Sequence, residues 1–478
     1  MSLLRRPLLV LALAASCSPP GDASAATGPR DVVVVVLDAL PAPALGCYGY
    51  ERDTSPRIDA FAAGAVRFAD AYAPASYTLA STASLFTGLA PGAHGVVGLD
   101  SNLLADGHHV LAESLAAAGF RSAAFSCNPH VTAECGFGQG FEHFRHYARD
   151  RFDRHAVPEP LIGDVAAWWD EHAGERRFLY VHLLPPHQPY DPPPPYGALF
   201  GADASPREEG MTDFLVALDG EHRVAGEPAL RERIRARYDA GLRYADAAFG
   251  ELLDALDARG ADESALVVLL SDHGEGFGEH GRLLHGSTVF SEMTHVPLVA
   301  RAPGLAAGVR ETLVGTRDLA ATLTALVDAP WPRGGRAGAS FADVLLGVEP
   351  EPEPEAQARD GDGGERGVVS RSVGNRPLWS LRTERWTLVE HRASGALHLF
   401  ERETDPGETR DVASSESALA RELQGRLRRR LGEDKRLHEH LGVGTGAVDR
   451  YRAELRDLGY AGDEEPVDEP PDAAGTDQ

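Results

Sequence analysis

The sequence predicts an α/β fold: a three-layer sandwich around a large, mostly parallel central sheet, followed by a small C-terminal α+β subdomain with an antiparallel sheet. Two runs predict the central sheet. Residues 31–37 (DVVVVVL) and 265–270 (ALVVLL) are continuous and apolar, which is typical of strands buried on both faces of a parallel sheet. The subdomain is predicted by three short segments after residue 377, which are rich in aromatic and β-branched residues and read as antiparallel strands.

Local signals place the elements between these runs. A serine and a proline open an expected helix at residues 55–63, and Gly88 closes one that begins near Thr78. Apolar periodicity indicates helices at 110–118, 229–259, 317–322 and 415–431, and strands at 121–126, 178–184, from 294 onward, 378–383, 385–389 and 397–400. Residues 201–228 are polar, so we expect an irregular surface insertion or a lip over a site.

Carboxylates follow both apolar strands. Asp38 comes after the first strand, and Asp272 and His273 come after the second. The carboxyl ends of parallel strands meet at the crevice where open α/β sheets bind ligands. With the Thr78 hydroxyl, these groups form an oxygen-rich set with one imidazole, which predicts one divalent ion: calcium, manganese or zinc. Taken alone, Thr78 also fits a helix N-cap without a chemical role.

Composition limits the partners and the location of the protein. The 478-residue chain has a formal net charge of −26, which argues against binding to nucleic acid or to an anionic membrane surface. Two arginines and an apolar run within residues 1–16 are typical of a secretory signal. Ala15-Ser16 before Cys17 resembles a lipobox, so we expect a periplasmic or cell-envelope protein. It would be either anchored by lipid at Cys17 or released after cleavage near residues 23–26.

Composition also divides the chain into five expected segments. They are a signal peptide and tether at 1–29, the main α/β domain at 30–348, a disordered acidic linker at 349–367, the small C-terminal subdomain at 368–462 and an acidic tail at 463–478.

Three cysteines follow the expected signal. An exported setting permits a Cys127–Cys135 disulfide that leaves Cys47 free. The alternative is three buried thiols.

Five stretches, spanning roughly residues 30 to 460, carry a resemblance to a known family. They read VVVLDALPAPALGCYGYERDTSPRIDAFA, SYTLASTASLFTGLAPGAHGV, VHLLPPHQPYDPP, VVLLSDHGEGFGEHGRLLHG and LFERETDPGETRDVAS. In these residues the chain resembles the sulfatase family of the alkaline phosphatase superfamily. The resemblance implies a metal-dependent, sulfatase-like catalytic domain at 30–348, with Thr78 at the position of the family's Cys or Ser nucleophile.

The resemblance implies roles for four more residues. Asn128 and His130 stand where the family has a lysine and a histidine that contact the substrate, and an amide can still donate to an oxyanion. The alternative for Asn128 is a structural turn. His187 stands at a catalytic, substrate-contacting position of the family. His285 replaces a lysine of many sulfatases and is the expected general acid.

The chain also departs from the family's pattern. Formylglycine is made from Cys or Ser, so Thr78 cannot supply it. Ala80 and Thr82 replace the proline and arginine of the nucleophile motif, and Ala39 replaces a second aspartate. What remains resembles the threonine-nucleophile members of the superfamily, which act on phosphoric or phosphonic esters. The D-x-x-x-H pattern of two-metal members is absent, which favours one ion.

Three classes of function remain open from the sequence. The first is a hydrolase of phosphoric, phosphonic or sulfuric esters, and its mechanism favours phosphoesters. The second is a phospho-transferase that acts on envelope glycans or lipids. The third is a non-catalytic binding protein with a degenerate site. The substrate would be a small-molecule, glycan or lipid ester, and the sequence does not determine the oligomeric state.

Overall fold

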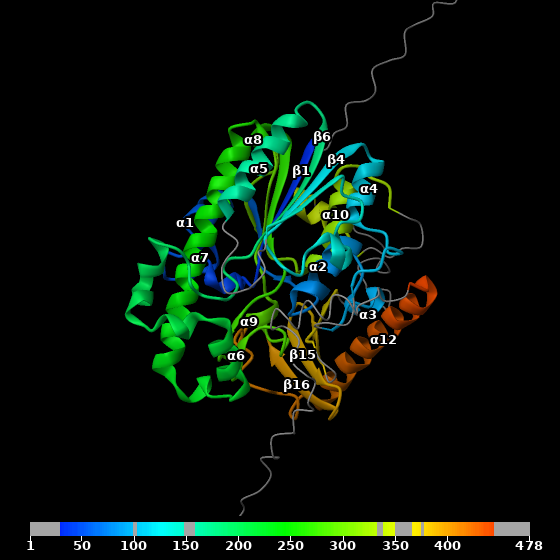
Figure 1. Ribbon diagram of the computed structural model, residues 1–478. Coiled ribbons are helices and arrows are strands. Elements are labelled where there is room, and N and C mark those ends of the chain that lie inside the picture. Colours follow the sequence, from blue (N-terminus) through cyan, green and yellow to red (C-terminus); the bar gives the residue numbers. More distant parts are fainter. Residues whose placement is uncertain are drawn as a thin grey trace, which may run out of the picture.

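The computed structural model in Figure 1 describes residues 29–98, 103–147, 158–331, 338–348, 366–373 and 377–443. The expected signal and tether, including Cys17, lie outside the described residues except for residue 29. So do the acidic tail, residues 349–365 of the expected linker and residues 444–462 of the expected subdomain. Within the described ranges, no helix combines the length and apolar character that a membrane crossing requires.

The central sheet has the strand order β11-β2-β10-β7-β1-β6-β4-β5. Its strands are β1 (Asp31–Leu37), β2 (Val66–Phe68), β4 (Phe120–Ser126), β5 (His143–His146), β6 (Arg176–Leu183), β7 (Ala265–Ser271), β10 (Leu298–Arg301) and β11 (Gly308–Arg310). β1 is parallel to both β6 and β7, and β4 is parallel to β5 and β6. The mostly parallel sheet is confirmed. The strand expected from residue 294 begins at Leu298, is antiparallel to β7 and is not the last of the sheet, because β11 follows it.

Helices cover both faces of this sheet. The helices on one face are α1 (Pro56–Ala63), α5 (Pro158–Glu171) and α7 (Pro228–Asp257), and those on the other are α2 (Thr78–Thr87), α4 (Leu111–Ala117) and α10 (Leu319–Leu326). Successive valines of β1 alternate between the two layers, since side chains of a strand point to opposite faces. Val33 and Val35 pack with the α7 side, whereas Val32 and Val34 pack with the α2 side.

A second, separate sheet follows in the chain. It is antiparallel and consists of β13 (Val368–Arg371), β14 (Leu378–Arg382), β15 (Trp386–His391) and β16 (Ala396–Glu401). The helix α12 (Ser417–Leu441) packs on it through Leu423 and Leu427 and extends ten residues beyond the expected end at 431. The small antiparallel sheet of the predicted fold is therefore confirmed.

The stretch expected to be irregular at 201–228 contains the helix α6 (Thr212–Gly220). Leu215 and Leu218 of this helix are buried in the main core, so the expectation of an irregular segment was wrong. The remaining α-helices and strands are short: α3 (Pro91–His94), α8 (Ala261–Ser264), α9 (Ser291–Thr294), α11 (Ala342–Leu346), β3 (Ala71–Tyr72), β8 (Gly276–Phe277), β9 (Leu283–Leu284) and β12 (Val314–Gly315).

The Cys127–Cys135 disulfide is absent. Cys47, Cys127 and Cys135 are all free thiols, the first half-buried and the other two buried. Burial raises the pKa of the Cys127 thiol to about 12, so it stays protonated at neutral pH.

Candidate active site

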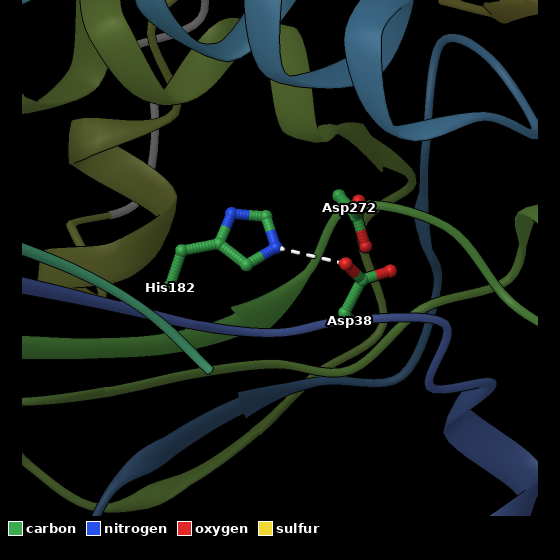
Figure 2. Close-up of side chains that lie close together, drawn as sticks. All are labelled: Asp38, His182 and Asp272. Atoms are coloured by element: carbon green, nitrogen blue, oxygen red, sulfur yellow. Dashed lines mark hydrogen bonds and ion pairs between the residues drawn. The ribbon is translucent and has the colours of Figure 1, made fainter. Parts of the chain in front are cut away.

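The two strand-end carboxylates lie side by side. β1 and β7 are adjacent and parallel, with Leu37 opposite Ser271, so the next residues along the two strands are neighbours. These residues are Asp38 and Asp272, and both are buried. Figure 2 shows their carboxylates close together. The register of one ladder thus brings together two groups that are far apart in the sequence.

The helix α2 presents Thr78 to this pair. Thr78 is its first residue and Tyr77 is the N-cap, so the plain N-cap interpretation of Thr78 was wrong. The hydroxyl of Ser81, one turn further, donates to the carbonyl oxygen of Asp272 at 2.5 Å and ties the helix to the end of β7. The Thr78 Oγ1 atom lies 3.1 Å from the Nε2 atom of His273.

His273 stands between the hydroxyl and the carboxylates. Its Nε2 atom lies 3.6 Å from Asp38 Oδ1 and 3.5 Å from Asp272 Oδ2. Its Nδ1 donates to the carbonyl oxygen of Gly274 at 2.9 Å, so in the neutral ring Nε2 carries the lone pair. The structure therefore brings together the four side chains expected to bind the metal.

These four groups fit a divalent cation. Asp38 Oδ1 and Asp272 Oδ2 are buried and have no hydrogen-bond partner among the described residues. Unpaired carboxylate oxygens are costly to bury, and a cation bound between them removes that cost. Two carboxylates, one hydroxyl and one imidazole nitrogen are a ligand set for calcium, manganese or zinc.

Electrostatics at the site follow from burial and from these close charges. Burial would raise the pKa of Asp38, but the imidazoles of His187, His182 and His273 outweigh it and hold the pKa below its usual value. Burial and the charge of Asp38 raise the pKa of Asp272. Burial would lower the pKa of His273, but Asp272 and Asp38 raise it above its usual value. The pair of carboxylates is thus a strong local attraction for positive charge.

His182 was missed from the sequence. It lies in β6 opposite Val36 of β1, and its Nε2 donates to Asp38 Oδ2 at 3.3 Å (Figure 2). The hydroxyl of Tyr180 donates to its Nδ1 at 2.9 Å. Asp38, His182 and Asp272 each offer one ligand atom within 4.8 Å of the others, so His182 also stands within reach of a metal. The signal in the sequence was a histidine inside the run 178–184 (FLYVHLL), which is otherwise apolar.

Asn128 lies beyond the end of β4 and also contacts Asp38. Its Nδ2 donates a short hydrogen bond to Asp38 Oδ2. Its Oδ1 accepts from the backbone N–H groups of His130 at 2.6 Å and Val131 at 3.2 Å. The side chain expected to contact the substrate is thus engaged with Asp38 and with the turn at 128–131.

Three more imidazoles surround this centre. Nε2 of His130 lies 3.2 Å from the hydroxyl of Tyr77. The ring centre of His285 lies 4.9 Å from that of His187 and 4.3 Å from that of His273. Burial lowers the pKa of His130 to about 3 and also lowers the pKa values of His187 and His285. All the residues predicted for catalysis and substrate contact therefore gather at one end of the sheet.

We expect His182→Ala to weaken the affinity for Mn²⁺ by about 10- to 100-fold, the usual loss when a group that supports a ligand is removed. Asp38 would lose a donor to Oδ2 and with it part of its fixed orientation. Calorimetric titration of the metal-free protein measures the affinity. The matched variant Tyr180→Phe, which removes only the donor to His182, should give a smaller loss. An unchanged affinity in His182→Ala would contradict this role.

Comparison with known proteins shows that the chain is similar to sulfatases. A family model described as Sulfatase matches residues 30–329. Human arylsulfatase A is 28% identical over 389 residues, which cover 71% of each chain. An arylsulfatase of Clostridium perfringens is 24% identical over 57% of this chain and 69% of that protein. Among solved structures, the phosphonate monoester hydrolase of Agrobacterium radiobacter has a TM-score of 0.68 and 21% identity, and the match covers 85% of this chain and 96% of that one.

Proposed function

Because the chain belongs to the sulfatase family, we propose that it is an exported, metal-dependent ester hydrolase that uses Thr78 as its nucleophile. We propose phosphoric or phosphonic esters of small molecules, glycans or lipids as its substrates. The observation that supports this most is the position of Thr78 Oγ1. It lies 3.1 Å from His273 Nε2 at the start of α2, next to the unpartnered oxygens of Asp38 and Asp272.

A divalent ion held by Asp38, Thr78, Asp272 and His273 would supply Lewis acidity that favours the threonine alkoxide. The start of α2 adds unpaired backbone N–H groups and the positive end of the helix dipole, which favour an anionic ester group there. The buried surroundings keep bulk water away from the nucleophile.

The chemistry of threonine supports phosphorus rather than sulfur as the centre attacked. Thr78 Oγ1 would attack phosphorus, and the leaving oxygen would depart with a proton from His285. The phosphothreonine would then be hydrolysed by water in line. The site lacks the formylglycine precursor and the arginine that the family's motif uses on sulfate, since Thr78 and Thr82 stand in those positions.

Sulfuric esters are the second candidate, because the named relatives are arylsulfatases. Under this alternative Thr78 would act on sulfur without an aldehyde hydrate.

A phospho-transferase is the third candidate. Thr78 would attack phosphorus as in the hydrolase, and the phosphoryl group would then pass to an acceptor alcohol in place of water.

A substrate panel separates these candidates. We expect the metal-loaded protein to hydrolyse aryl phosphodiesters and phosphonate monoesters faster than the matching aryl sulfate, because threonine lacks the aldehyde hydrate that the family uses on sulfate. Release of the common chromogenic phenol measures all the esters in one assay. A transferase would release phenol faster when an acceptor alcohol is added. A higher kcat/KM on the aryl sulfate would contradict the proposed preference.

A further inference from the structure

A short hairpin joins the site to a buried glutamate. β8 and β9 pair in antiparallel fashion with Gly276 opposite Leu284, so the next residues outward, Glu275 and His285, face each other. The backbone at Leu284 is left-handed, with φ of 59°, and so is that at Gly286, with φ of 88°. Leucine adopts this conformation only when its surroundings enforce it. The turn around His285 is therefore held in an unusual shape.

The two side chains form a buried hydrogen bond. His285 Nδ1 lies 3.0 Å from Glu275 Oε1, and the side chains are 8% and 0% exposed, respectively. The rings of His273 and His187 pack against the His285 ring from the side of the proposed metal. His285 Nε2 makes no hydrogen bond within the part of the chain that the structure describes. Packing and one hydrogen bond thus fix the ring and leave Nε2 available to a substrate.

The two imidazoles that pack against His285 cannot take the same part in their neutral form. Nδ1 of His187 donates to the carbonyl oxygen of Gln188 at 2.6 Å, and Nδ1 of His273 donates to that of Gly274. A carbonyl only accepts, so Nδ1 holds the proton in both rings and Nε2 holds a lone pair. His285 is different, because a carboxyl group can either donate or accept. When Glu275 and His285 together hold two protons, one proton lies in the hydrogen bond between Nδ1 and Oε1, and the other is on His285 Nε2. This is true whether the first proton is bound to the carboxyl group or to the imidazole.

We propose that Glu275 is the positioning residue that makes His285 the proton donor to the leaving group. This inference rests on the proposed function. As the bond between phosphorus and the leaving oxygen breaks, the proton on His285 Nε2 passes to that oxygen, and the pair retains the single proton of the Nδ1–Oε1 bond. When water then attacks the phosphothreonine, its proton returns to Nε2 and restores the pair.

The experiment compares Glu275→Leu, which removes the hydrogen-bonding group, with Glu275→Gln, which keeps an oxygen at the same place. Each is assayed on a p-nitrophenyl ester, whose leaving group needs little protonation, and on the matching alkyl ester, which needs a proton donor. We expect Glu275→Leu to lower kcat on the alkyl ester by about 10- to 100-fold, the range for loss of an orienting group, with little change on the p-nitrophenyl ester. Glu275→Gln should restore part of the loss.

The same loop supplies a matched control. His280 Nδ1 lies 2.9 Å from Glu292 Oε1, so these residues form a second His–Glu pair. The Nε2 atom of His280 is already bonded to the backbone carbonyl of Glu408, whereas that of His285 is available. Glu292→Gln should leave the ratio of the two rates at the wild-type value. Equal losses on both esters in Glu275→Leu, or no rescue by Glu275→Gln, would overturn the proposal.

A second measurement needs no substrate. The ring ¹⁵N shifts of His285, assigned with His285→Gln, should indicate one fixed protonation form in the wild type and in Glu292→Gln, and averaged tautomers in Glu275→Leu. If the wild type hydrolyses no ester but the shifts behave in this way, the proposed function fails and the positioning by Glu275 stands. If esters are hydrolysed but the shifts of Glu275→Leu match the wild type, only the positioning fails.

Discussion

Replacement of Thr78 by alanine is expected to lower kcat/KM of the metal-loaded protein by more than about 10⁴-fold, beyond the upper end of what loss of a proton-transfer group costs. The change removes the attacking oxygen and also one of the four groups that face the proposed ion. The loss should exceed that of His285→Ala on the same ester, because an ester with a good leaving group still reacts without a proton donor.

The control for this change is Thr78→Ser, which keeps the hydroxyl and loses only a methyl group. It should retain measurable phosphoesterase activity. Mass spectrometry of quenched turnover should find a phosphoryl group on the peptide that contains residue 78 of the wild type, and none on that of Thr78→Ala. If Thr78→Ala hydrolyses the ester at the wild-type rate, the proposed mechanism is wrong and a binding function is favoured.

Asp272→Ala is expected to reduce the metal content from about one divalent ion per chain to near zero and to abolish activity, because a buried anionic ligand is lost. Asp272 also organises its surroundings: its Oδ1 accepts from the backbone N–H groups of Ala39 at 3.3 Å and His273 at 2.9 Å. Inductively coupled plasma mass spectrometry of the purified proteins measures the metal content.

Asp272→Asn separates the two roles of this side chain. The amide oxygen can keep the bonds to Ala39 and His273, but the charge is gone, so we expect weaker metal binding and a metal-free thermal stability near that of the wild type. Two ions per wild-type chain would show that the single-ion site is wrong. Full activity after complete chelation would show that the ion is not needed.

Much of the fold could be predicted because its strongest signals are local. The run of valines at 32–36 has no polar face and consists of β-branched residues, which is typical of a strand buried on both sides, and β1 is buried on both faces. α6 was missed because its apolar residues stand next to one another. Residues 214–218 read FLVAL, a run without a clear helical period. Only the folded chain shows that Leu215 and Leu218 are buried while Val216 is exposed.

The strand-end carboxylates, the helix-start hydroxyl and the family could be identified from the sequence, since each rests on residues adjacent along the chain. The contacts that hold Asp38 could be found only in the folded chain. His182 and Asn128 reach it from β6 and from the end of β4, across separations of 144 and 90 residues. The tertiary structure also decided that His285 is paired with Glu275, through the register of one hairpin. Such contacts depend on strand order and register. These are set by the packing of whole sheet and helix faces, so they cannot be predicted from the individual residues that make the contacts.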